Sequence, residues 1–130
     1  MIVRHPPFLK EAQHRILILS EDPHLGGSMG CDLNRLGLHA FVDTNFSLFK
    51  TPTKALPYDG IILDLDTSES CKFQVFRNFT AAYPEIPVVV IGTESMYYDI
   101  LFAYMGGAKD FLVKPVDSVF FKHLCLRLFL

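Results

Sequence analysis

The chain has 130 residues, half of them hydrophobic, so it can bury the core of one domain without help from metals or disulfides. Its formal charge of -2 at pH 7 argues against binding of nucleic acid by this domain, because contacts with phosphates need clustered Lys and Arg. The three cysteines, Cys31, Cys71 and Cys125, form no CxxC pair and no cluster at metal-ligand spacing, which predicts free thiols and a cytoplasmic location.

In chain order, residues 1–14 come first and lack the apolar centre of a signal peptide, so we expect a short N-terminal leader followed by one domain over 15–130. No later apolar run approaches the length of a membrane span, and we expect no membrane contact. Four short runs rich in Ile, Val and Leu predict strands that are buried on both faces of a parallel sheet. They cover residues 15–19, 60–65, 88–91 and 110–113.

The segments between these runs have the apolar spacing of helices, which parallel strands need as crossovers. Asp22 followed by Pro23 is typical of a helix start, and Gly37 of a helix end. Residues 39–42 predict an additional strand. The remaining predicted helices are a weak one at 47–56, a third marked by Phe73, Phe76 and Phe79, a fourth at 96–105 and a fifth at 118–130.

Five repeats of strand and helix, joined by right-handed crossovers, predict an open doubly wound sheet with helices on both faces. Ligands of such sheets bind beyond the carboxyl ends of the strands, where this chain places Ser20, Glu21, Asp64, Asp66 and Lys114. Carboxylates suit Mg²⁺ and a lysine suits a phosphoryl oxygen, so this edge has the composition of a phosphoryl-transfer site. Polar residues also end strands simply because they meet solvent, and spacing alone leaves both interpretations open.

Four segments, in order, resemble the receiver domains of two-component response regulators, and the match runs from about residue 15 to the end. They are RILILSEDP at 15–23, DGIILD at 59–64, PEIPVVVI at 84–91 and GAKDFLVKP at 107–115. The resemblance implies an α/β flavodoxin-like fold, with a doubly wound five-stranded parallel sheet in the order 2-1-3-4-5.

The resemblance also implies roles for single residues. Asp64 stands where the family has its phospho-accepting aspartate, which takes a phosphoryl group from a histidine kinase or phosphotransfer protein. Lys114 would pair with Asp64, and its bond to Pro115 is expected to be cis. Phe111 stands where the family has an aromatic that changes rotamer on activation. We expect no enzyme activity beyond autophosphorylation and slow dephosphorylation of this aspartate.

A magnesium site and two departures from the family pattern belong to the same edge. The resemblance implies Mg²⁺ bound by Glu21, Asp64 and the backbone carbonyl of Asp66. Ser20 stands where the first acid of the pair is usual, so we expect weak binding, because Mg²⁺ demands near-ideal octahedral geometry. The switch Ser/Thr position falls on Gly92, which has no hydroxyl to bind a phosphoryl oxygen.

The helices at 96–105 and 118–130 carry more large apolar side chains than one buried stripe requires. The resemblance implies that the face they form with strand 110–113 serves a homodimer or an output domain; a following domain of a longer protein would explain the excess equally well. Two functions therefore stay open. One is a receiver that signals through phosphorylated Asp64, and the other is a phosphate-independent pseudo-receiver that acts as a protein–protein interaction module.

Overall fold

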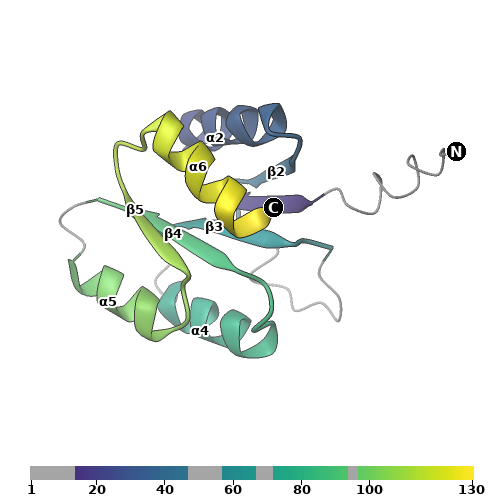
Figure 1. The fold of residues 1–130 in the computed structure, drawn as a ribbon. Coiled ribbons are helices and arrows are strands. Elements are labelled where there is room, and N and C mark those ends of the chain that lie inside the picture. Colours follow the sequence, from purple (N-terminus) through teal and green to yellow (C-terminus); the bar gives the residue numbers. More distant parts are fainter. Residues whose placement is uncertain (1–13, 47–56, 67–71, 94–96) are drawn as a thin grey trace, which may run out of the picture.

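The computed structural model describes residues 14–46, 57–66, 72–93 and 97–130, in which strands and helices alternate along the chain (Figure 1). The strands are β1 (Arg15–Leu19), β2 (His39–Asp43), β3 (Gly60–Asp64), β4 (Val88–Gly92) and β5 (Asp110–Val113). The helices in these segments are α2 (Pro23–Arg35), α4 (Lys72–Ala82), α5 (Tyr97–Met105) and α6 (Ser118–Phe129).

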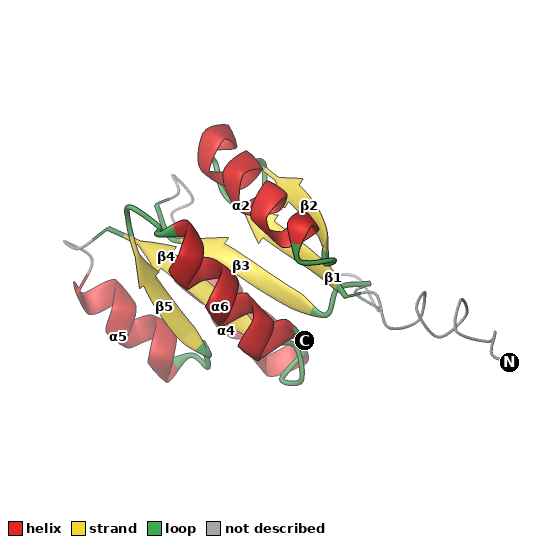
Figure 2. Ribbon diagram, turned by 45° about the horizontal axis from the view of Figure 1, so that its top comes forward, coloured by secondary structure: helices red, strands yellow, loops and turns green. Residues whose placement is uncertain are grey.

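All five strands are parallel, in the order β2-β1-β3-β4-β5, which confirms the predicted doubly wound sheet. Helices α2 and α6 cover one face, and α4 and α5 cover the other (Figures 1 and 2). The register pairs Leu19 with Leu63, and Asp64 with Ile91, so the carboxyl ends of β1, β3 and β4 lie at one edge.

Burial explains why the central strands appear in the sequence as unbroken apolar runs. β3 and β4 are buried at every position, and β1 at all but its first, because each is covered by helices on both sides. One cluster packs Ile18 and Ile62 against α2 and α6, and the other packs Leu63 against Phe76 of α4 and Ala103 of α5. β2 lies at the edge of the sheet and is only partly covered.

Asp22 and Pro23 begin α2, as the sequence predicted. The carboxylate of Asp22 accepts hydrogen bonds from the backbone N–H groups of His24 (3.0 Å) and Leu25 (3.3 Å), and Pro23 occupies the first turn, where it costs no hydrogen bond. After the helix, Gly37 has a positive φ of 87°, a conformation that glycine adopts without strain.

Some predictions fall outside the described residues. These are the helix at 47–56, the thiol of Cys71, the side chain of Phe73, and the leader apart from His14, whose carbonyl accepts a hydrogen bond from the N–H of His39 at 2.8 Å. The third predicted helix is present as α4, with Phe76 buried and Phe79 partly buried. No described helix combines the length and apolar character that crossing a membrane requires.

Candidate functional site

Three of the expected site residues meet at the edge where the parallel strands end. Asp64 is the last residue of β3 and is 1% exposed, while Ser20 follows β1 directly and is 0% exposed. Lys114 follows β5, and its backbone N–H donates to the carbonyl of Gly92 at the end of β4 (2.9 Å), which fixes where its side chain starts. The Lys114–Pro115 peptide bond is cis, as expected.

Among the described residues, three groups donate hydrogen bonds to the buried carboxylate of Asp64. Its Oδ2 accepts from the Ser20 hydroxyl (2.9 Å) and from the Lys114 ammonium (2.9 Å), and its Oδ1 accepts from the backbone N–H of Asp66 (2.9 Å). A buried charge is tolerated only when it is paired and hydrogen-bonded, and these three donors, from segments far apart in the sequence, meet that condition.

Lys114 contacts a second carboxylate as well. Its Nζ lies 3.0 Å from Oδ2 of Asp66, whose side chain is 34% exposed. Burial lowers the pKa of Lys114, but hydrogen bonds and charge attraction from Asp64 and Asp66 outweigh it, so the net effect is a raised pKa. The amino group of Lys114 is therefore protonated and positively charged at neutral pH, and it bridges the two carboxylates.

The neighbours of Ser20 have other contacts. Ser20 Oγ accepts a hydrogen bond from the backbone N–H of Asp22 (3.2 Å), while the Asp22 carboxylate caps α2. Glu21 is exposed. Across the described segments, no three Asp, Glu, His or Cys side chains lie close enough together to hold a metal ion.

The donors at this edge fit the expected Mg²⁺ poorly. Mg²⁺ needs oxygen ligands at about 2.0 to 2.1 Å in octahedral geometry. Ser20, where the resemblance led us to expect a carboxylate, has a buried hydroxyl that donates to Asp64. The ammonium of Lys114 already lies between the carboxylates of Asp64 and Asp66.

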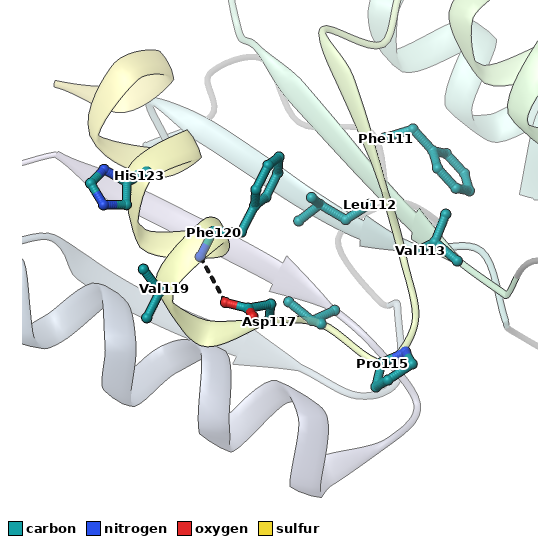
Figure 3. Close-up of a pocket in the computed structure, with 9 residues that line it drawn as sticks. Phe111, Leu112, Val113, Pro115, Asp117, Val119, Phe120 and His123 are labelled. Atoms are coloured by element: carbon teal, nitrogen blue, oxygen red, sulfur yellow. Dashed lines mark hydrogen bonds between the residues drawn. The ribbon is translucent and has the colours of Figure 1, made fainter.

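Gly92 and Phe111, the two expected switch positions, differ in what they offer. Gly92 is buried at the end of β4 and has no side chain, and Thr93 follows it partly exposed. Phe111 is partly buried and packs against the apolar cluster under α4 and α5. Figure 3 shows Phe111 and Val113 on one side of β5 and Leu112 on the other. Phe111 therefore belongs to the apolar packing on the side of the sheet that α4 and α5 cover.

The excess of apolar side chains in the last two helices is exposed, as the sequence indicated. We call the surface of α5, β5 and α6 the α5–β5–α6 face. Its exposed large apolar residues are Tyr98, Leu101, Phe102, Tyr104, Met105, Val113, Val119, Phe120 and Leu126. A groove of about 620 Å³ between β5 and the first turns of α6 adds to it, lined mainly by apolar side chains together with Asp117 and His123 (Figure 3). Exposed large apolar side chains in this number are typical of interaction surfaces.

Sequence reasoning missed two contacts of the site. It assigned only the carbonyl of Asp66, whereas the carboxylate also contacts Lys114, and it treated Ser20 only as a lost acid, whereas the hydroxyl donates to Asp64. The position of Ser20 at the end of a central strand was the available signal. Its partner, 44 residues away, was not indicated.

No protein-family model matches the sequence. The chain is 28% identical over 104 residues to the transcriptional regulatory protein QseB of Haemophilus influenzae. The matched region covers 78% of this chain and 46% of QseB. The chain thus spans less than half the length of this relative. Among solved structures, the BeF3-activated receiver domain of DrrB, from Thermotoga maritima, matches with a TM-score of 0.76 at 18% identity, over 89% of this chain and 97% of that one. The chain has a receiver-domain fold.

A second structure supports the same assignment. The chemotaxis response regulator CheY4 of Vibrio cholerae matches with a TM-score of 0.76 at 16% identity, over 89% of this chain and 98% of CheY4. The fold that the chain shares with these structures places Ser20 after β1 and Gly92 at the end of β4, both at the carboxyl edge of the sheet.

Proposed function

We propose that this receiver-type domain is the input module of a signalling protein, and that its Asp64 accepts a phosphoryl group from a histidine kinase or phosphotransfer protein. The observation that carries the proposal is the Lys114 ammonium, held 2.9 Å from the buried carboxylate of Asp64. A fixed cation beside a carboxylate nucleophile is what phosphoryl transfer requires, because catalysis there is mostly positioning and neutralisation of charge.

The chemistry assigned to the chain's own residues is simple. An oxygen of Asp64 attacks the phosphorus, the bond between phosphorus and the donor breaks, and the donor keeps that electron pair. Lys114 neutralises the oxygens of the transferred group. The Mg²⁺ that the resemblance implies at Glu21, Asp64 and the Asp66 carbonyl fits these residues poorly, and no step here relies on it.

The output of the proposed module is the α5–β5–α6 face, which would bind a second copy of the chain or an output domain. Phosphorylation would change the charge at the end of β3, where Asp64 contacts Lys114, the residue that follows β5. Phe111 lies within β5, so this strand would carry the change from the site to the face. A two-state domain that binds its partner in only one state converts this local change into a signal.

Surroundings and partners follow from composition. Cys31 and Cys125 are unpaired thiols, as expected of a protein in the reducing cytoplasm, where we place this domain. With a net charge of -2, the domain itself is not expected to bind nucleic acid.

The second candidate function is a phosphate-independent pseudo-receiver that acts as an interaction module. Gly92, with no hydroxyl to bind a phosphoryl oxygen, and Ser20, in place of the first acid, favour it. Both candidates use the same fold and the same α5–β5–α6 face, and they differ in whether Asp64 is modified.

Intact mass after incubation with acetyl phosphate separates the two candidates. The comparison needs wild type, Asp64→Asn, and Asp110→Asn as a control, because Asp110 starts β5 at the opposite edge of the sheet. We expect one phosphoryl group on wild type and on Asp110→Asn, and none on Asp64→Asn. An unlabelled wild type, beside a receiver domain that does label, would replace the first candidate with the second.

A further inference from the structure

Ser20 is fixed as a hydrogen-bond donor to Asp64. Its Oγ accepts from the backbone N–H of Asp22 at 3.2 Å, and the carboxylate of Asp64 lies at 2.9 Å, nearer than the Asp22 carbonyl at 3.4 Å. A carboxylate oxygen is also the stronger acceptor. The hydroxyl hydrogen of Ser20 therefore points to Asp64, and Ser20 is 0% exposed, so bulk water does not compete for this bond.

Lys114 places a cation between the carboxylates of Asp64 and Asp66. Its ammonium lies 2.9 Å from Asp64 and 3.0 Å from Asp66, with one oxygen of each carboxylate in contact. The two carboxylates and the ammonium together carry a single negative charge, and the serine adds none. Both the ammonium and the hydroxyl contact Oδ2 of Asp64, so a divalent ion bound at that oxygen would have to displace them.

We propose that Lys114 is the resident cation of the Asp64 site, and that Ser20 is the residue that makes this site independent of divalent metal ions. A carboxylate at position 20 would lack the proton that Ser20 donates. It would instead face Asp64 as a like charge, a pair that a divalent ion relieves. Serine removes that charge and satisfies the same oxygen of Asp64 with a hydrogen bond.

The proposal concerns the same site as the proposed function, but its test needs no phosphoryl transfer. Mn²⁺ serves as the probe, because free Mn²⁺ is counted directly by electron paramagnetic resonance. The variants are Asp64→Asn, Ser20→Asp, and Ser20→Asn, which has nearly the size of aspartate but no charge. Folding is followed by circular dichroism with and without Mn²⁺.

We expect wild type, Asp64→Asn and Ser20→Asn to bind the same small amount of Mn²⁺. We expect Ser20→Asp to bind one further ion, at least about tenfold more tightly than wild type, and to lose it when Asp64→Asn is added. A Ser20→Asp chain that folds only with Mn²⁺ would support the proposal as well.

Wild type that holds one Mn²⁺ per chain, lost in Asp64→Asn, would overturn the proposal, whether or not acetyl phosphate labels the chain. Folded Ser20→Asp with no gained ion, or Ser20→Asp that stays unfolded with Mn²⁺, would refute the role given to Ser20. A wild type that neither binds Mn²⁺ nor becomes labelled would remove phosphoryl transfer and leave the metal independence standing.

Discussion

Replacement of Lys114 by methionine tests how much the ion pair at the strand ends stabilises the fold. Methionine keeps most of the side-chain volume and removes the charge. The substitution breaks the contact with Asp64, which is 1% exposed, and the contact with the more exposed Asp66. Of the donors in the described segments, the buried carboxylate then keeps the hydroxyl of Ser20 and the N–H of Asp66.

The magnitude follows from these exposures. Removing one partner of a fully buried ion pair costs about 3–5 kcal/mol. Lys114 itself is 21% exposed, and two donors to Asp64 remain, so we predict a loss of about 2–3 kcal/mol in the free energy of unfolding. The half-exposed contact with Asp66 contributes under about 1 kcal/mol of this.

Urea denaturation followed by circular dichroism measures the loss, with Lys122→Met on α6 as the control, expected to change stability by less than about 0.5 kcal/mol. Adding Asp64→Asn to Lys114→Met should cost less than the two single changes together, because the double variant no longer buries an unpaired charge. A Lys114→Met chain as stable as the control would refute the ion pair as a stabilising contact.

The pH dependence has a definite sign. The pKa of Lys114 is raised in the folded chain above 10.5, so its contribution is complete below pH 10.5 and is lost as the pH rises through the higher folded value. The difference between wild type and Lys114→Met should therefore stay constant from neutral to mildly alkaline pH and shrink above pH 10.5. A difference that shrinks already near neutrality would contradict this assignment.

Three further predictions concern the helices and the core. In urea denaturation, Phe121→Ala should lower the free energy of unfolding by about 3–5 kcal/mol and Phe120→Ala by under about 0.5 kcal/mol, because their side chains are 0% and 60% exposed. Equal losses would refute the orientation of α6, which buries Phe121 and exposes Phe120. Gly60→Ala should lower the free energy of unfolding by about 1–3 kcal/mol, because the new Cβ would lie 2.4 Å from an aromatic ring of the core. Gly27→Ala should stabilise α2 by about 0.5–1 kcal/mol, because nothing lies within 4 Å of its new Cβ. A Gly60→Ala chain as stable as wild type would be inconsistent with the packing around Gly60. Burial raises the pKa of Cys125 from 9.0 to about 12. Between pH 9.0 and about pH 12, the free energy of unfolding of wild type should therefore fall by about 1.4 kcal/mol per pH unit relative to that of Cys125→Ala. Stabilities of the two chains that change in parallel with pH would exclude a buried thiol.

The fold was predictable where local and periodic signals agree. Unbroken apolar runs identified the central strands, since helices cover both faces of the sheet. Asp22, Pro23 and Gly37 set the ends of the first helix segment through rules that act within a few residues. The strand boundaries moved by only one residue, with β3 ending at Asp64 and β4 extending to Gly92.

The site was predictable as a set of residues and not as a set of contacts. Parallel strands bring their carboxyl ends to one edge, which places Ser20, Asp64 and Lys114 together. The hydroxyl that donates to Asp64 and the ammonium that bridges to Asp66 depend on side-chain directions, and no local pattern encodes these. Likewise, apolar content indicated an exposed surface on α6, but the phase of the helix decides that Phe120 and not Phe121 belongs to it.

Whether Asp64 controls the α5–β5–α6 face is tested most directly by amide NMR spectra recorded before and after addition of acetyl phosphate. The signals to follow are those of β5 and α6, with Asp64→Asn as the control. We predict that the signals of both elements shift in wild type and stay in place in Asp64→Asn. Wild-type signals that do not move, or that move equally in the variant, would contradict signalling through Asp64.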